Sequence, residues 1–243
     1  MAYSDKFDAP RIDLASDVPV RIWNPNVPDD LPLPLLVVHD GTEYDERSWL
    51  ICQLNDLISS GTVTPHRVAL VDPVWGLRNN WYGASPAYQD TLANSVIPEV
   101  RKRVAVVGSI IGGGASLGAI SMFGCENAFP GTFGGIFGQS TSFHHHDYGT
   151  DNLRSEYDEY DRVTALVEHI RSTAPVRKLN IGLTWTDGPG LHGNEAMGNI
   201  LSDQGHIMSG GKVSGGHDYF SWGNAIVPHL GNLLSRAWSD SQH

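Results

Sequence analysis

The chain has 243 residues, 40% of them hydrophobic, and a formal net charge of −11 at pH 7. This length and composition are typical of a folded domain with a sizeable core. The negative charge argues against a nucleic-acid partner or an anionic membrane surface, because both attract positively charged proteins.

The first residues and the cysteines bear on the cellular location of the protein. Residues 1–14 contain no apolar segment typical of a secretory signal, and no run of 18 apolar residues occurs anywhere. We therefore expect no membrane span and a cytoplasmic location. Cys52 and Cys125 are too few for a disulfide framework, and both lie among apolar residues at helical spacing. We expect two buried free thiols. The sequence leaves a homo-oligomer open.

Short apolar runs rich in β-branched residues recur along the chain. They suit strands that are buried on both faces of a parallel sheet. These predicted strands cover residues 34–40, 67–72, 103–109, 133–140 and 179–187. The segment 11–25 resembles one or two additional edge strands.

Helical patterns alternate with these strands. They cover residues 45–60, 86–103, 119–129, 157–172, 193–205 and 221–238. Gly61 is a plausible cap of the first helix, and Pro98 is expected to break the second. The alternation predicts an α/β fold with a mostly parallel sheet and helices on both faces. In such a sheet, ligands bind beyond the carboxyl ends of the strands.

The glycine-rich segment 109–123, SIIGGGASLGAISMF, raises the question of a phosphate-binding loop. Gly113 and Gly118 have the Walker spacing, but Ala119 and Ile120 follow where that loop needs Lys and Ser or Thr. Read as a dinucleotide fingerprint from Gly112, the third glycine falls one place late. The segment therefore does not indicate a nucleotide site.

The same segment contains G-x-S-x-G, formed by Gly114, Ser116 and Gly118, between a predicted strand and a predicted helix. This is the context of a nucleophilic serine on a sharp turn, where side chains two positions away on either side would clash. The N-terminus of the following helix directs backbone N–H groups at a developing oxyanion. The alternative is a tight structural turn with an idle serine.

A nucleophilic serine needs a base and an orienting acid, which follow it along the chain in the order acid, histidine. His217 lies in the glycine-rich segment SGGHDYFSW before the last helix, and Asp187 ends the last predicted strand. We predict a catalytic triad of Ser116, His217 and Asp187, with Glu195 as the alternative acid. Asp218 is expected to point away or to cap the helix.

Four segments, 35–41, 114–123, 133–143 and 215–222, together resemble the putative-esterase branch of the α/β-hydrolases. That branch includes enterochelin-type siderophore esterases, esterase D-like S-formylglutathione hydrolases and mycolyltransferases. The resemblance covers about residues 31–233, and the G-G-H-D segment with its tryptophan is most similar to the siderophore trilactone esterases. It implies an α/β-hydrolase fold in a single domain over 1–243, with N-terminal edge strands in 1–30 and the catalytic core in 31–238.

The resemblance also implies an activity. It indicates a serine esterase that cleaves a small-molecule carboxylic ester through an acyl-enzyme and needs no cofactor. The backbone N–H groups of Leu117 and of the Gly41–Thr42 turn would form the oxyanion hole. Arg78 would contact an acidic or catecholate substrate, with a surface salt bridge as the alternative. Ala119 replaces a glycine that many members carry there. An acyltransferase, a thioesterase or a non-catalytic scaffold are alternatives on the same fold.

The remaining candidates concern substrate binding. Residues 144–146 are three adjacent histidines, which cannot all face one metal from a strand or a helix. We therefore expect no metal site and a polar loop at the cleft, with His144 as its substrate contact. Trp75 and Trp222 lie near predicted loop or strand ends, where they would suit an aromatic substrate, although core packing is the alternative.

Overall fold

The computed structural model describes residues 2–155, 158–188 and 191–238. Its described strands form one sheet in the order β1-β3-β5-β4-β6-β7-β8-β9, and β2 also pairs with β3. The strands are β1 (Ala2–Tyr3), β2 (Phe7–Ala9), β3 (Val18–Asn24), β4 (Leu33–His39), β5 (Arg67–Val71), β6 (Val106–Ala115), β7 (Gly135–Gln139), β8 (Asn180–Trp185) and β9 (Ile207–Lys212). From β5 to β9 the pairing is parallel, and β3 is antiparallel to its neighbours. The mostly parallel sheet is confirmed.

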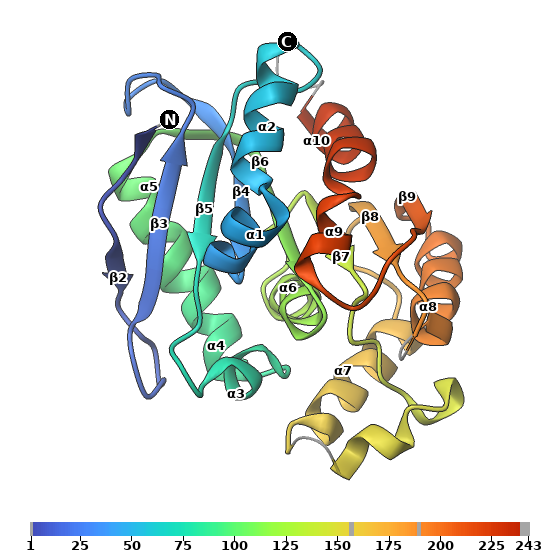
Figure 1. Cartoon of the computed structure of the whole chain (residues 1–243). Helices are drawn as coiled ribbons and strands as arrows, with labels where there is room; N and C mark the ends of the chain where they lie inside the picture. Colours follow the sequence, from blue (N-terminus) through green and yellow to red (C-terminus); the bar gives the residue numbers. More distant parts are fainter. Residues whose placement is uncertain (1, 156–157, 189–190, 239–243) are drawn as a thin grey trace.

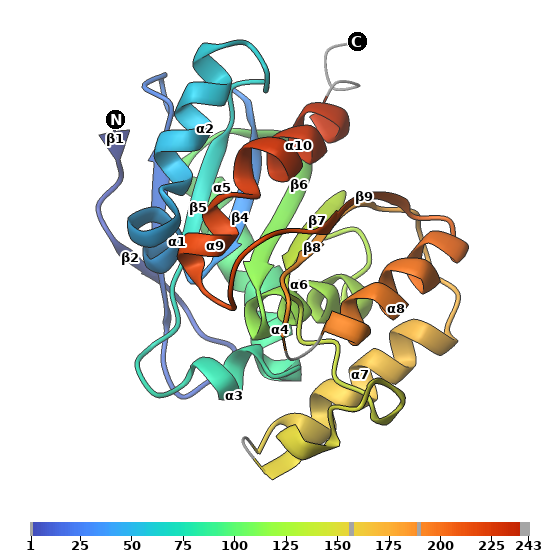
Figure 2. The same cartoon turned by 45° about the vertical axis from the view of Figure 1, so that its right-hand side comes forward.

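Helices cover both faces of this sheet (Figure 1). They are α1 (Gly41–Ser48), α2 (Leu50–Ser59), α3 (Arg78–Tyr82), α4 (Pro86–Thr91), α5 (Ile97–Arg103), α6 (Leu117–Ala128), α7 (Tyr160–Ser172), α8 (Leu191–Asp203), α9 (Tyr219–Gly223) and α10 (Gly231–Trp238). Helices α2 and α10 pack on one face, and α4 to α8 lie on the other, with α7 and α8 side by side (Figure 2).

Successive residues of the central strands enter two different cores. On β4, Leu36 and Val38 pack with the α2 and α10 side, whereas Val37 packs with the α4 and α6 side. Every residue of β4, β5 and β7 is buried. A continuous apolar run is the pattern that such doubly covered strands require, which is why these strands were predictable.

The sequence prediction missed β9 and misplaced the ends of β6. β9 is an edge strand whose residues are all exposed or half-buried, and it contains two glycines of positive φ, so it has no apolar run to detect. β6 begins at Val106 instead of residue 103 and continues through the glycines to Ala115. A Cβ on Gly112 would meet Met122 Sδ at 3.1 Å and the Phe133 ring at 3.3 Å. The close packing of α6 against this strand therefore favours glycine there.

Three helix predictions were wrong in detail, and one of them, 221–238, covers α9, a π-helical turn (Ile226–Leu230) and α10. The predicted helix 45–60 is two helices, α1 and α2, separated by Trp49 in the left-handed conformation (φ 51°). The predicted break at Pro98 does not occur, because a π-helical turn (Leu92–Val96) leads into α5 with the proline in its first turn. At that position the N–H that proline lacks costs few helical hydrogen bonds, so the helix continues through Pro98.

The cysteine prediction holds for one residue only. Cys125 is buried on α6, but Cys52 is exposed on α2. The buried stripe of α2 consists of Leu50, Ile51, Leu54 and Leu57, and position 52 lies off that stripe. Among the described residues, no helix combines the length and the apolar character that crossing a membrane requires.

Candidate active site

Ser116 occupies the sharp turn between β6 and α6. Its backbone has φ 54° and ψ −124°, a conformation that residues other than glycine rarely adopt, and its side chain is half-buried. A Cβ on Gly114 would lie 2.7 Å from the carbonyl carbon of Gly118. The predicted steric need for small neighbours is therefore confirmed, and the turn presents the Ser116 hydroxyl beyond the carboxyl end of β6.

Backbone N–H groups from two helix N-termini are available near this serine. Leu117 and Gly41 are the first residues of α6 and α1, so their N–H groups have no partner within their own helices. The N–H of Thr42 is different, because it donates to Asp72 Oδ1 at 2.8 Å, and the Thr42 hydroxyl donates to Asp72 Oδ2 at 2.7 Å. Of the predicted pair in this turn, the N–H of Thr42 is already bound to Asp72, whereas among the described residues no hydrogen bond from the Gly41 N–H occurs.

His217 lies in the loop between β9 and α9 and lines the same cleft as Ser116. Its ring packs edge-on against the Trp222 indole, with 4.9 Å between ring centroids, and the Trp222 Nε1–H donates to Ser140 Oγ at 3.2 Å. Among the described residues, no hydrogen bond joins His217 to Ser116, whose hydroxyl lies 3.2 Å from Ser142 Oγ. The sequence thus selected two residues, Ser116 and His217, that line the same cleft. Trp222 packs against the ring of His217.

The electrostatic surroundings of His217 favour its neutral form. Partial desolvation of the ring lowers the pKa of His217, the nearby Arg78 cation lowers it further, and Asp218 raises it. A neutral imidazole is the form that accepts a proton from a serine hydroxyl. His217 is therefore suited to act as a base near neutral pH.

The carboxylates proposed as orienting acids lie elsewhere in this structure. Asp187 follows β8, is 72% exposed, and pairs through Oδ1 with Lys212 Nζ at 2.6 Å. Glu195 is exposed on α8. Among the described residues, neither carboxylate is hydrogen-bonded to His217. Asp218 caps α9 by accepting the Ser221 N–H at 2.9 Å, as the sequence predicted.

Arg78 begins α3 and lines the cleft, but its guanidinium is already engaged. Its Nε and Nη2 donate to the two oxygens of Asp40 at 2.8 and 2.7 Å. Asp40 is 2% exposed and precedes α1 in a left-handed conformation (φ 53°). The pair joins the turn after β4 to the segment after β5, and both residues line the cleft.

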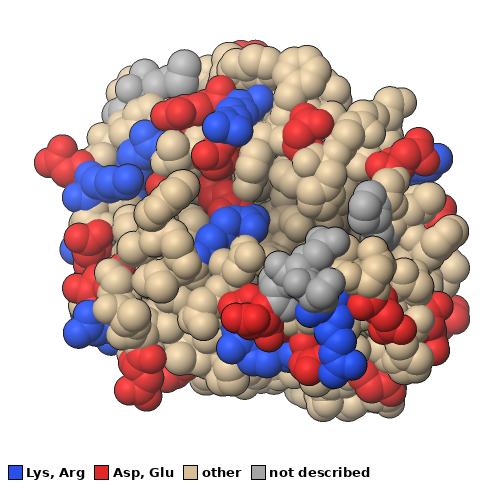
Figure 3. Space-filling model, turned by 60° about the horizontal axis from the view of Figure 1, so that its bottom comes forward, with Lys and Arg blue, Asp and Glu red and all other residues tan. Residues whose placement is uncertain are grey.

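The cleft is large and has an aromatic rim. Its volume is about 1160 Å³, and it opens on the face that carries the carboxyl ends of the parallel strands, where Figure 3 shows acidic and basic side chains around a hollow. Trp75 is 99% exposed at this rim. Trp49 and Phe220 form an exposed aromatic pair at the same cleft, with ring centroids 5.7 Å apart. The sequence analysis missed this pair because the two residues are 171 positions apart along the chain.

His144 lies deeper than the predicted substrate contact requires. Its side chain is buried and stacks on Tyr160, with ring centroids 6.1 Å apart. Burial, with a smaller contribution from His217, lowers the pKa of His144 to about 4. The structure therefore places a neutral His144 near His217.

Solved structures of similar shape include esterases. The enterobactin esterase from Shigella flexneri, in a structure with enterobactin, superposes with a TM-score of 0.78 at 18% identity over 99% of this chain and 60% of that one. A ferulic acid esterase matches at 0.76 and 16% identity over 96% and 97% of the two chains. An IroE-like serine hydrolase from Shewanella oneidensis matches at 0.68 and 12% identity over 96% and 80%. This chain has the α/β-hydrolase fold.

The resemblance inferred from the sequence is thus confirmed at the level of the α/β-hydrolase fold. No protein-family model matches the sequence, and no curated protein matches it. The chain spans about 60% of the length of the enterobactin esterase, so the activity of that whole protein is not carried over directly. Placed on the hydrolase fold, β6 and α6 are the strand and helix that flank the predicted nucleophile turn.

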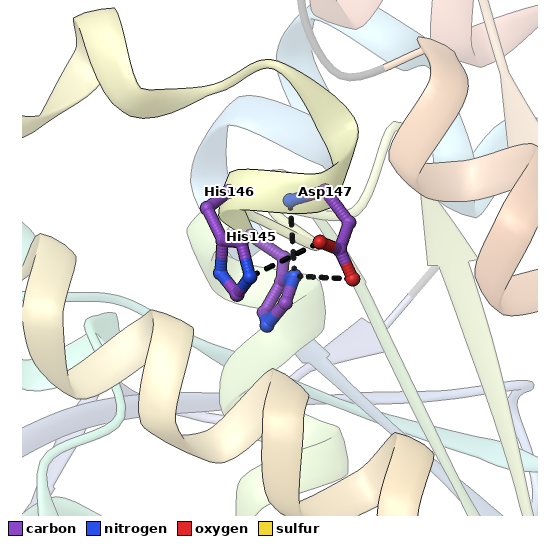
Figure 4. A group of neighbouring side chains, drawn as sticks. All are labelled: His145, His146 and Asp147. Carbon is purple, nitrogen blue, oxygen red and sulfur yellow. Dashed lines mark hydrogen bonds and ion pairs between the residues drawn. The ribbon is translucent and has the colours of Figure 1, made fainter.

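A separate cluster of His145, His146 and Asp147 lies in the loop after β7 (Figure 4). Asp147 contacts both rings, at 3.5 Å from His145 Nδ1 and 3.0 Å from His146 Nε2. Arg171 on α7 reaches into the same group, with Nη1 2.7 Å from Asp147 Oδ2 and 2.8 Å from His145 Nδ1. A metal ion at this group would have to displace the guanidinium, so we assign the cluster to an ion-pair network.

Proposed function

We propose that the protein is a serine esterase that cleaves a carboxylic ester through an acyl-enzyme. One observation carries the proposal: Ser116 stands in a strained strand-to-helix turn and shares a single cleft with His217. Leu117 and Gly41 are the first residues of α6 and α1, so the backbone N–H of each lacks a partner within its own helix. These are the parts that acyl transfer by a serine requires.

The proposed reaction has two steps. Ser116 Oγ attacks the ester carbonyl carbon while His217 takes the hydroxyl proton, and the leaving alcohol departs with that proton. Water then attacks the acyl-enzyme, His217 again takes and returns a proton, and the acid product is released. The N–H groups of Leu117 and Gly41 stabilise the oxyanion formed in both steps.

We propose Asp187 as the acid that orients His217. Asp187 follows β8 and His217 follows the neighbouring β9, so the two loops leave the same edge of the sheet. The present partner of Asp187 is the exposed Lys212, and an exposed ion pair contributes only about 0–1 kcal/mol. The carboxylate therefore loses little when it turns toward His217.

The cleft favours a large ester that carries aromatic groups, and a siderophore trilactone is our first candidate substrate. Its volume of about 1160 Å³ exceeds the range of about 300–1,000 Å³ usual for small-molecule sites. Trp49, Trp75 and Phe220 offer exposed rings at the rim. The similar structures include an enterobactin esterase and a ferulic acid esterase.

The nucleophile is tested with p-nitrophenyl acetate and a fluorophosphonate probe. We expect Ser116→Ala to lose several orders of magnitude in turnover and all labelling. Ser142→Ala is the matched control, because it removes the neighbouring hydroxyl, and it should keep the labelling. Undiminished turnover by Ser116→Ala, with the wild type active, would contradict the assignment.

The substrate is tested separately with a panel of esters that includes a catecholate trilactone. Product analysis with and without an added acceptor alcohol distinguishes hydrolysis from acyl transfer. We expect the free acid to be the product in both cases. An ester product that forms only with the acceptor would identify an acyltransferase instead.

A further inference from the structure

A buried carboxylate lies beside the proposed oxyanion hole. Asp40 Oδ2 is 3.2 Å from the position that a Cβ on Gly118 would take, which places it against the first turn of α6. Asp40 also directly precedes Gly41, whose N–H is the second proposed donor. The carboxylate therefore lies close to both donors.

A negative charge at this place opposes the proposed reaction. The carbonyl oxygen becomes negative in the transition state, and like charges in a site shielded from water repel more strongly than they do in bulk water. Asp40 is only 2% exposed, so solvent does little to screen it. An uncompensated Asp40 would thus slow the chemical step.

Arg78 supplies the compensating charge in a fixed geometry. Its two hydrogen bonds to Asp40 are parallel and short, at 2.8 and 2.7 Å, which is the bidentate arrangement that fixes both partners. Its guanidinium also lies over the Tyr82 ring, 5.4 Å from the centroid. Both hydrogen bonds go to Asp40, so the edge of the guanidinium that carries Nε and Nη2 is already engaged.

We infer that Arg78 is a positioning residue: it cancels the charge of Asp40 beside the oxyanion hole and fixes the turn that carries the Gly41 N–H. The inference rests on the proposed esterase function, and it differs from a role in binding an anionic substrate. A substrate anchor would act on KM. Charge compensation acts on kcat, and its loss is repaired by removing the carboxylate as well.

The experiment is a double-mutant cycle on an ester that the wild type hydrolyses, with folding checked by urea denaturation and the nucleophile by fluorophosphonate labelling. Its variants are Arg78→Met, Asp40→Asn and the double variant. The control is Arg103→Met, because Arg103 also pairs with a carboxylate, Glu99, and lies over a ring, that of Phe7, but at the amino ends of the strands.

We expect Arg78→Met to lower kcat about 10- to 100-fold with little change in KM. The double variant should recover kcat to within about threefold of Asp40→Asn, and Arg103→Met should match the wild type. If Arg78→Met misfolds, the double variant is compared with Asp40→Asn, which measures what Arg78 contributes once the carboxylate is gone. A kcat of the double variant well below that of Asp40→Asn contradicts charge compensation.

Two results overturn the inference alone while the wild type is active. One is a raised KM with unchanged kcat in Arg78→Met, which indicates a substrate anchor. The other is a double variant no more active than Arg78→Met, which indicates a purely structural pair. A wild type that neither labels nor hydrolyses esters overturns the proposed function itself, and this inference with it.

Discussion

Replacing Gly114 with alanine tests the steric basis of the nucleophile turn. The added Cβ would lie 2.7 Å from the carbonyl carbon of Gly118, 2.8 Å from its oxygen and 2.9 Å from the Ala119 nitrogen. All three are backbone atoms, so no side-chain rotation relieves the contact. β6 and α6 must separate by about 0.8 Å for the carbon atoms to reach ~3.5 Å.

We expect Gly114→Ala to lower the free energy of unfolding by about 3 kcal/mol, the upper end of the range for overpacking. For a chain of this size that corresponds to a fall in Tm of roughly 6–12 °C. Ester turnover of the folded fraction should fall by about a hundredfold, because displacement of a catalytic group by about 1 Å has that effect. Urea denaturation followed by tryptophan fluorescence, with a p-nitrophenyl ester assay, measures both.

Gly113→Ala is the matched control in the same strand. A Cβ there would lie 3.6 Å from Val38 Cγ2 and 3.7 Å from Leu36 Cδ1, which are ordinary contacts. We expect its unfolding free energy to stay within about 1 kcal/mol of the wild type, with a small gain from the stiffer unfolded chain. Equal stability of the two variants would refute the steric reasoning.

Two further predictions concern charge. Asp187→Asn should lower kcat/KM by on the order of a hundredfold or more if Asp187 orients His217. Lys212→Met should keep or raise kcat/KM, because Lys212 competes with His217 for the Asp187 carboxylate. Equal effects of the two variants would reject Asp187 as the acid. Burial lowers the pKa of His39 and of His66 to about 4. The stability that depends on these two neutral rings is therefore fully present above pH 6.5, and as the pH falls toward 4 the free energy of unfolding decreases by on the order of 3 kcal/mol per ring. Urea denaturation across that range should show a smaller loss in His66→Leu, and a flat profile in the wild type would contradict the prediction.

Local patterns made much of the fold predictable. Strands covered on both faces are largely apolar, so β4, β5, β7 and β8 were readable from their apolar runs, although polar residues such as His39, Arg67 and Gln139 are buried at their ends. β9 was not, because an edge strand with exposed residues and glycines carries no such pattern. The continuous helix through Pro98 also escaped prediction, since the π-helical turn that accommodates it depends on the surrounding packing.

The site divides in the same way. The turn at Ser116 could be predicted because its steric demands depend on its immediate neighbours, Gly114 and Gly118, and His217 could be proposed from the chain order of the fold. Their catalytic roles stay predictions. The partners of Arg78 and Thr42 could not, since Asp40 and Asp72 come from other strand ends that only the sheet brings together. The pairing of Asp187 with Lys212 likewise depends on β8 lying next to β9.

The sequence by itself therefore determined the alternation of strands and helices and the sharp turn at Ser116, because these depend on residues within a few positions of one another, and it predicted the segment that carries His217 from the chain order of the fold. Only the tertiary structure decided which carboxylate meets which cation, which backbone N–H groups near Ser116 are bound by side chains, and which aromatic rings line the cleft. Those are contacts between residues far apart along the chain, and their geometry is set by the order and register of the strands.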